Sequence, residues 1–210
     1  MGDTWQLAAR VRRDFADMVE GLDDAQLDGP TLSGDWTARH ILGHLVFIAE
    51  MKIPSFFVAM AKAGFNYDKM ADIQARKNAE RPLDDLLSSL RARAARSAPM
   101  PGFAEGVTVA DVAVHTQDIR RPNNIAGTFD DDVLTSALDA LATDRVGKGL
   151  ADIPNRDQVT FTADDLDWSS GSGPAVTGPA ESLLLLLGGR DVLDELSGDG
   201  LADIQATEIR

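Results

Sequence analysis

The sequence contains no cysteine among its 210 residues. Disulfide bonds, thiolate metal sites and a cysteine nucleophile are therefore excluded. The motif G-x-S-x-G, which presents a nucleophilic serine at a strand-to-helix turn, does not occur either, and this argues against a serine hydrolase of that type. Any reactive sulfur used by this protein must arrive on a cosubstrate.

Basic residues and long hydrophobic runs are also scarce. Twenty lysines and arginines stand against 34 acids, giving a net charge of −14, which argues against nucleic acid and anionic lipid as partners. The first five residues show no basic and apolar leader, and the longest charge-free stretch, Trp168–Ala180, is too short and too polar to span a bilayer. We expect a cytoplasmic protein without a membrane association.

The first 150 residues show the periodicity of amphipathic helices. Apolar residues recur at spacings of three and four, as in Leu7, Val11, Phe15, Met18 and Leu22. Helices joined by short loops are typical of an up-and-down bundle. The predicted helices cover residues 7–22, 36–49, a region opening at Pro54, 68–79, 83–95, 107–121 and 131–145.

The tail, residues 151–210, differs from the first 150 residues in its predicted secondary structure and in its charge. Residues 151–210 carry 12 acids and 3 bases. We predict a strand at 159–162, helical segments at 183–187 and 192–196, and a closing strand at 201–204, with a glycine-rich loop from Gly171 to Gly178. The fold class is therefore α+β and mainly α, with a helical domain at 1–150 and a small α/β domain at 151–210. The boundary is placed near Pro154.

Two of the three histidines and one aspartate form a candidate metal site. His40 and His44 share one face of the second helix, while Asp111 and His115 are one turn apart on the helix over 107–121. If His44 meets the other pair across a bundle core, two imidazoles and a carboxylate leave positions open for water or substrate. A catalytic zinc or another divalent ion suits such a set.

Structural interpretations stand beside this one. Thr108-x-x-Asp111 fits a capping box, so Asp111 would then only cap its helix. Asp118 could orient a ligating imidazole or could face solvent. His40 could be a fourth ligand, a proton carrier or a surface residue. The basic residues that lie among acids between 72 and 96 are typical of a solvated helix face, with anion binding as the alternative.

Three segments together resemble a known family. Trp36-Thr-Ala-Arg-His-Ile-Leu-Gly-His44-Leu is similar to the "GW-x-x-x-D-x-x-x-H-L" signature of DinB-like helical bundles, and Asp111-Val-Ala-Val-His115-Thr-Gln-Asp118 is similar to an "E-x-x-x-H-x-x-D" helix. The tail, from Thr162 through Gly200 and including Arg190, resembles a small C-terminal domain found in the same proteins. The sequence thus resembles the mycothiol-dependent maleylpyruvate isomerase family.

The resemblance implies a DinB-like four-helix bundle that holds a divalent metal, usually zinc, through His44, Asp111 and His115. It also implies mycothiol as cosubstrate, whose thiol adds to a small electrophile, so that the protein would be a thiol-using isomerase or S-transferase. Asp118 and Arg190 are the candidate catalytic residues, and Arg190 would hold a substrate carboxylate.

Two residues depart from the family pattern. Asp111 stands where glutamate is commoner, which requires the metal to lie closer to that helix or weakens the site. His40 stands where aspartate or another polar residue is usual. The alternatives to the leading hypothesis are a non-catalytic binding or regulatory protein on the same scaffold and a metal-dependent hydrolase. A homodimer is left open.

Overall fold

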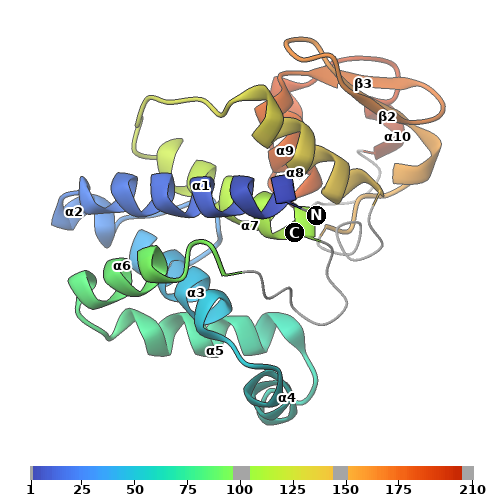
Figure 1. Ribbon diagram of the computed structural model, residues 1–210. Coiled ribbons are helices and arrows are strands. Elements are labelled where there is room, and N and C mark those ends of the chain that lie inside the picture. Colours follow the sequence, from blue (N-terminus) through green and yellow to red (C-terminus); the bar gives the residue numbers. More distant parts are fainter. Residues whose placement is uncertain (1, 97–104, 144–150, 205–210) are drawn as a thin grey trace. The chain divides into compact units, whose positions relative to one another are not determined.

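The structure is a computed structural model that describes residues 2–96, 105–143 and 151–204 (Figure 1). The chain divides into two compact units. The N-terminal unit comprises Met1–Pro101 and Asp118–Ala126, and the C-terminal unit comprises Gly102–Gln117 and Gly127–Arg210. The predicted domain boundary at residue 150 stays a prediction.

The N-terminal unit is helical. Its core gathers around α3, which packs against α5 and α6, while α1 packs against α6. Fully buried side chains at the centre include Phe15, Ile41, Leu42, Met70 and Leu86. The helices of this unit are α1 (Gly2–Glu20), α2 (Asp24–Leu27), α3 (Ala38–Glu50), α4 (Ile53–Lys62), α5 (Tyr67–Ala79) and α6 (Leu83–Ala92).

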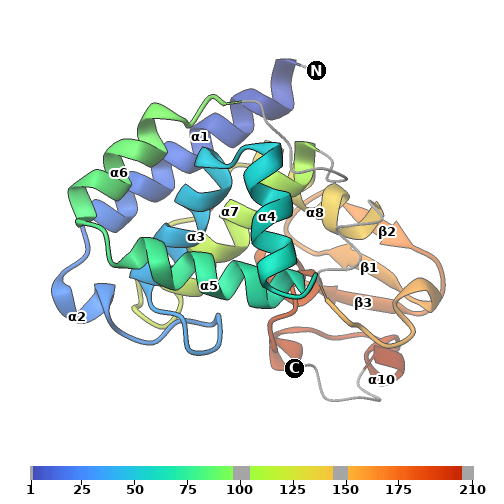
Figure 2. The same ribbon diagram turned by 90° about the horizontal axis from the view of Figure 1, so that it is seen from below.

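The C-terminal unit combines helices with a small sheet. Strand β1 (Thr160–Ala163) lies between β2 (Ser169–Gly171), which is antiparallel to it, and β3 (Ala175–Gly178), which is parallel (Figure 2). Helix α9 (Ala180–Leu187) packs against β1 and β3 on one side and against α8 (Asp131–Thr143) on another.

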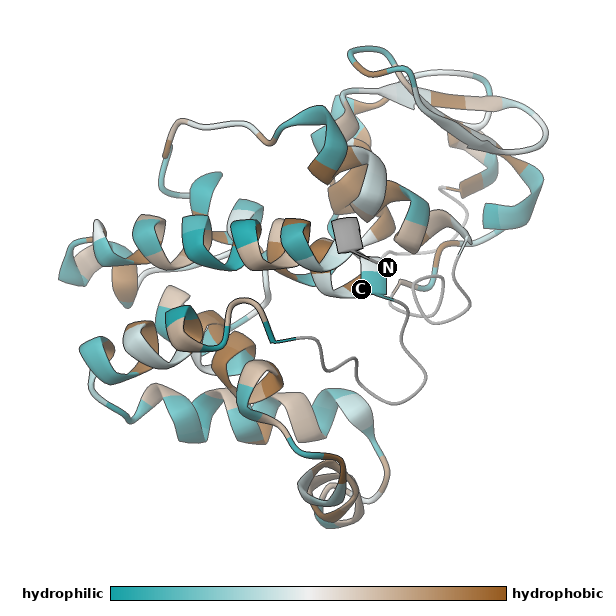
Figure 3. Cartoon of the chain, in the orientation of Figure 1, coloured by the Kyte–Doolittle hydropathy of each residue, from teal (hydrophilic) through white to brown (hydrophobic). Residues whose placement is uncertain are grey.

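Burial explains the composition of these helices. Hydrophilic and hydrophobic residues alternate along α1, as expected for a helix with one solvated face, whereas α9 is largely hydrophobic (Figure 3). All of α9 except Glu181 is buried, which accounts for its run of five leucines. No helix among the described residues is long and apolar enough to cross a membrane.

The predicted fold class is confirmed: a mainly helical N-terminal region is followed by a small three-stranded sheet with helices. Of the helix predicted at 131–145, Asp131–Thr143 is helical, and the last two residues lie outside the described ranges. The short helix α2 was not predicted, although Asp23 and Gln26 form the capping box that starts it.

Three predictions in the tail are wrong. The segment predicted as a glycine-rich loop supplies part of β2 and all of β3. The predicted closing strand at 201–204 is instead α10 (Leu201–Ile204), which places Leu201 and buried Ile204 one turn apart. The helix predicted at 192–196 is only a 3-10 turn, Leu193–Glu195.

Candidate metal centre

Helix α7 (Glu105–Arg120) carries Asp111 and His115 on successive turns. Nε2 of His115 lies 3.7 Å from Oδ1 of Asp111, which is too long for a hydrogen bond. Two ligand atoms bound to one tetrahedral ion, each at about 2.1 Å, would lie about 3.4 Å apart. The spacing therefore suits two ligands of a common ion better than a direct hydrogen bond.

Close packing fixes this part of α7 within the C-terminal unit. A Cβ added at Gly106 would lie 2.9 Å from Cβ of Ala140 on α8, and one added at Gly188 would lie 2.8 Å from Cγ2 of Val114. Small residues at these points thus bring α7 close to α8 and to the end of α9. Because α7 already includes Glu105, Thr108 lies inside the helix, and the predicted capping box at Thr108 and Asp111 is wrong.

His44 is positioned by α3 in the N-terminal unit. Thr37 is the N-cap of this helix, and His40 completes a capping box by accepting the backbone N–H of Thr37 at Nδ1, 3.1 Å away. His44 lies one turn further along, buried, with its ring centroid 5.3 Å from the ring of Trp36. The two rings are inclined at 45°.

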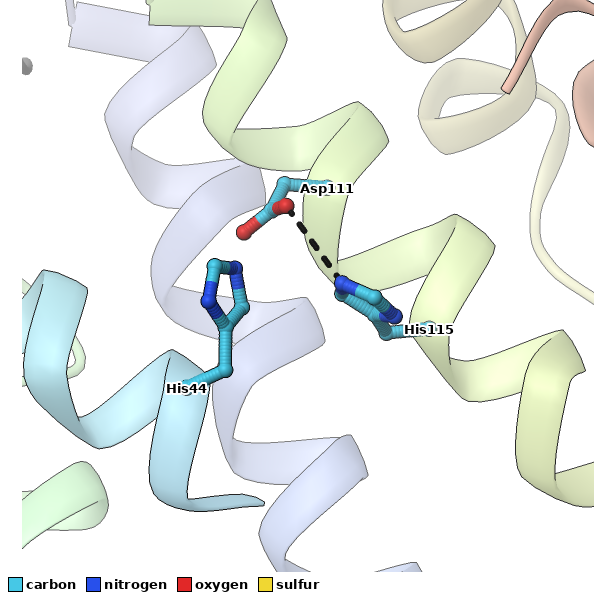
Figure 4. A group of neighbouring side chains, drawn as sticks. All are labelled: His44, Asp111 and His115. Atoms are coloured by element: carbon cyan, nitrogen blue, oxygen red, sulfur yellow. Dashed lines mark ion pairs between the residues drawn. The ribbon is translucent and has the colours of Figure 1, made fainter. Parts of the chain in front are cut away.

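Figure 4 shows the three predicted ligands together. One ligand atom from each of His44, Asp111 and His115 lies within 4.8 Å of the others. Both histidines are buried and Asp111 is half-buried. Two imidazole nitrogens and one carboxylate oxygen form a donor set that zinc and other divalent first-row metals accept, so these residues are a candidate metal site.

The remaining predicted site residues have distinct environments. Asp118 is fully buried, so the solvent-facing alternative is wrong, and its backbone carbonyl accepts a hydrogen bond from the amide of Leu32 at 3.1 Å. Arg190 follows α9 and is half-buried, and its Nη1 donates to the carbonyl of Gly188. The roles of Asp118 in orienting an imidazole and of Arg190 in binding a carboxylate stay predictions.

His40 serves its own helix. Its Nδ1 accepts the Thr37 amide, and it is not part of the cluster of potential ligands found among the described residues. Burial, with a smaller contribution from Arg76, lowers the pKa of His40 below its usual range, which outweighs the opposite influence of nearby aspartates. A neutral imidazole is the form that the capping hydrogen bond requires, because a protonated Nδ1 cannot accept it.

Three of the arginines that lie among the acids belong to an ion-paired face of the N-terminal unit. Arg76 contacts Asp35 and Asp72, Arg81 contacts Glu50 and Asp85, and Arg91 contacts Asp17 and Glu20. Each guanidinium is therefore engaged by two carboxylates within the unit, as expected for a solvated face rather than for anion binding.

One member of this face has a role that the sequence did not suggest. Oδ1 of Asp72 accepts hydrogen bonds from Nε1 of Trp36, at 3.0 Å, and from Nε of Arg76, at 2.7 Å. The hydrogen bond from Trp36, followed by that from Arg76, lowers the pKa of Asp72 despite its partial desolvation. The i, i+4 spacing of Asp72 and Arg76 was visible in the sequence, but the partner 36 residues away was not.

The chain thus has a helical N-terminal region, a small mixed sheet and a candidate His/Asp/His metal site. The fold is similar to that of the mycothiol-dependent maleylpyruvate isomerase, in a crystal structure of that protein and in one of its histidine-to-alanine mutant. Each match has a TM-score of 0.59 at 12% identity and covers 94% of this chain and 92% of the other. At that identity the likeness concerns the fold alone.

The sequence carries a partial family match. Residues 8–101 match the mycothiol maleylpyruvate isomerase N-terminal domain family. That segment contains His44 together with Trp36. A comparison with curated proteins finds no match.

Proposed function

We propose that this protein binds a divalent metal, most readily zinc, through His44, Asp111 and His115, and uses it in a reaction between a small thiol and a small electrophile. Mycothiol is the thiol that the family relationship favours, and isomerisation or S-transfer is the reaction class. The observation that carries the proposal is the grouping of two imidazoles and one carboxylate within 4.8 Å.

The chemistry follows from the donor set and from the missing cysteines. A bound divalent ion lowers the pKa of a coordinated thiol as it lowers that of water, and so supplies a nucleophile at neutral pH. His44 and His115 would each offer a neutral nitrogen and Asp111 one negative charge, which leaves the positive charge of a divalent ion only partly compensated. With no thiol of its own in 210 residues, the protein depends on a cosubstrate for sulfur.

Two further residues have proposed roles. The buried Asp118 would orient a ligating imidazole, because carboxylates commonly accept the second ring N–H of metal-bound histidines. Arg190 would bind a carboxylate of the electrophile, since a planar guanidinium can donate two parallel hydrogen bonds. Arg190 is one of only three basic residues in 151–210, against 12 acids, so an anionic substrate has few other partners there.

The metal is tested first. Protein loaded with zinc and then desalted should contain one equivalent by elemental analysis, and the variants His44→Ala and His115→Ala should each lose most of it. His40→Gln is the matched control, because it changes a histidine on α3 that caps its own helix, and its zinc content should equal that of the wild type. Unchanged zinc in His115→Ala, or no stoichiometric metal in the wild type, would overturn the proposed site.

The thiol is tested second. Isothermal titration calorimetry should show mycothiol binding to the zinc-loaded protein and not to the metal-free protein, and Arg190→Met should raise the KM for an electrophile that carries a carboxylate. Turnover in the absence of any thiol would instead indicate a metal-dependent hydrolase. Metal binding without thiol binding or turnover would indicate a non-catalytic binding protein.

A further inference from the structure

The ring of Trp36 lies against a proposed metal ligand, and a polar chain from α5 holds that ring in place. We infer that Trp36, anchored by Asp72, positions the His44 imidazole for metal binding. The inference rests on the proposed function for its metal, but the contacts that carry it all lie within the N-terminal unit. Trp36 and Asp72 act here as positioning residues, since neither offers a ligand atom to the metal.

Hydrogen bonds in the segment before α3 fix the backbone position from which the Trp36 side chain extends. Thr31 Oγ1 donates to the carbonyl of Trp36 at 2.6 Å and accepts the amide of Ser33 at 3.1 Å, while the Trp36 amide donates to the carbonyl of Ser33. Trp36 directly precedes the N-cap Thr37, so its side chain leaves the chain at the entrance of α3. This bonded turn restricts the backbone of Trp36 before any tertiary contact is considered.

The far end of the indole is fixed by α5. Nε1 of Trp36 donates to Oδ1 of Asp72, and the same oxygen accepts Nε of Arg76. Nη2 of Arg76 then donates at 2.7 Å to Oδ2 of Asp35, the residue next to Trp36 in sequence. Trp36 is therefore held at its backbone and at its ring nitrogen, and the acceptor Asp72 is itself ion-paired with Arg76.

His44 itself is set by the same helix. Asn78 Nδ2 donates to the carbonyl of Gly43 at 3.1 Å, and a Cβ at Gly43 would lie 2.5 Å from the carbonyl oxygen of Ala75. Helix α5 thus fixes the backbone beside His44 through Gly43, and the ring of His44 through Trp36. A ligand whose ring is already oriented loses less conformational freedom when it coordinates an ion.

A purely structural role is the competing interpretation, because an apolar residue before an N-cap often packs onto its helix as a staple. The two roles differ in what they affect. A staple would influence stability alone, whereas a positioning residue also influences metal affinity and coordination geometry. The chain supplies a control for this distinction: Trp168 in the C-terminal unit also donates its Nε1 to an aspartate, Asp139, at 2.9 Å.

Cobalt(II) binding to the full-length protein is the test. We expect Trp36→Leu to raise the Co²⁺ dissociation constant about tenfold, which is in the range found when groups that orient metal ligands are removed. Trp36→Phe should raise it less. Asp72→Ala should reproduce most of the loss without altering either ring, and it should add little in a Trp36→Leu background. Trp168→Leu should leave the dissociation constant within twofold of the wild type.

The visible spectrum of bound Co²⁺ is a second readout, because it reports coordination geometry rather than stability. Wild-type affinity and an unchanged spectrum in both Trp36→Leu and Asp72→Ala would overturn the inference. If wild-type protein binds no Co²⁺, the proposed function fails, and positioning is then tested without metal. The His44 ring protons, observed by NMR, should show a ring-current shift that Trp36→Leu removes and Trp168→Leu does not; an unchanged shift in Trp36→Leu would refute positioning.

Discussion

Gly43 is a point of close approach between α3 and α5, and substituting it tests how His44 is held. In Gly43→Ala the new Cβ would lie 2.5 Å from the carbonyl oxygen of Ala75 and 3.0 Å from the amide nitrogen of Ala79. Both atoms belong to the α5 backbone and cannot rotate away. The helices must therefore separate by about 1 Å to restore an ordinary contact, which begins at 3.4 Å.

The magnitude follows from three contributions. Overpacking against a rigid backbone costs about 3 kcal/mol, the upper end of the usual range. Separation of the helices also breaks the hydrogen bond from Asn78 to the Gly43 carbonyl, which contributes about 1 kcal/mol. Alanine in place of glycine inside a helix is stabilising by about 1 kcal/mol, which offsets part of this loss. The free energy of unfolding should fall by about 3 kcal/mol, and the melting temperature by about 6–12 °C.

Thermal unfolding followed by circular dichroism at 222 nm measures this change, and urea unfolding checks it. Gly21→Ala is the control, because its Cβ would approach nothing closer than the Met18 carbonyl oxygen at 3.5 Å and should alter stability by less than about 0.5 kcal/mol. Gly43→Ala should also weaken metal binding, since it displaces the residue next to His44. A Gly43→Ala variant as stable as the wild type would refute the close approach of α3 and α5.

Three further predictions concern other contacts. Because the pKa of His40 is lowered in the folded protein, the neutral imidazole stabilises the fold fully above pH 6.5, and this contribution is lost as the pH falls through the folded pKa. The variant His40→Gln keeps the capping acceptor and should remove that part of the pH dependence, which urea titrations at pH 5–7 would measure. Gly188→Ala should destabilise by about 1–2 kcal/mol, and Val114→Ala in the same chain should recover part of the loss; strictly additive losses would contradict the contact. In Arg91→Gln the ion pairs with Asp17 and Glu20 are lost, and any loss of stability should shrink between 0.05 and about 1 M salt, which melting curves at the two concentrations would check.

Several helices of the N-terminal unit were predictable because apolar residues recur along a buried face. In α1, the buried Val11, Phe15 and Val19 repeat at a spacing of four. The helix predicted over 7–22 overlaps α1, which begins five residues and ends two residues earlier. Helix α7 was predicted from its apolar content, although it is buried on most sides. Asp111 and His115 could be paired from their spacing alone, since residues four apart share a helix face.

The strands β2 and β3 were missed because their glycines look like turn residues. Gly171 and Gly173 have φ of 108° and 120°, and a Cβ at these positions would lie 2.2 Å from the carbonyl oxygen of Val159 and 2.0 Å from that of Gln158. They are glycines because the backbone passes close to the chain at the start of β1. Such a requirement arises from tertiary structure and leaves no periodic pattern in the sequence.

The anchoring of Trp36 could not be read from the sequence for a similar reason. Asp72 lies on α5 among residues with the pattern of a solvated face, and its carboxylate is indeed partly exposed. Only the packing of α3 on α5 brings Nε1 of Trp36 to it. A resemblance to a family can point to Trp36 as part of a motif, but the physical partner of its indole needs coordinates.

Helix α7 has a consequence for how this chain could be cut or recombined. Its residues Glu105–Gln117 belong to the C-terminal unit, and Asp118–Arg120 to the N-terminal one. A fragment ending at residue 150 would keep Val114 but lose Gly188, against which the Val114 side chain packs. Such a fragment would expose an apolar face of α7. Exchange of the tail between homologues should therefore succeed only when α7 and α8 travel with it, so that the helix carrying Asp111 and His115 is inherited together with the sheet.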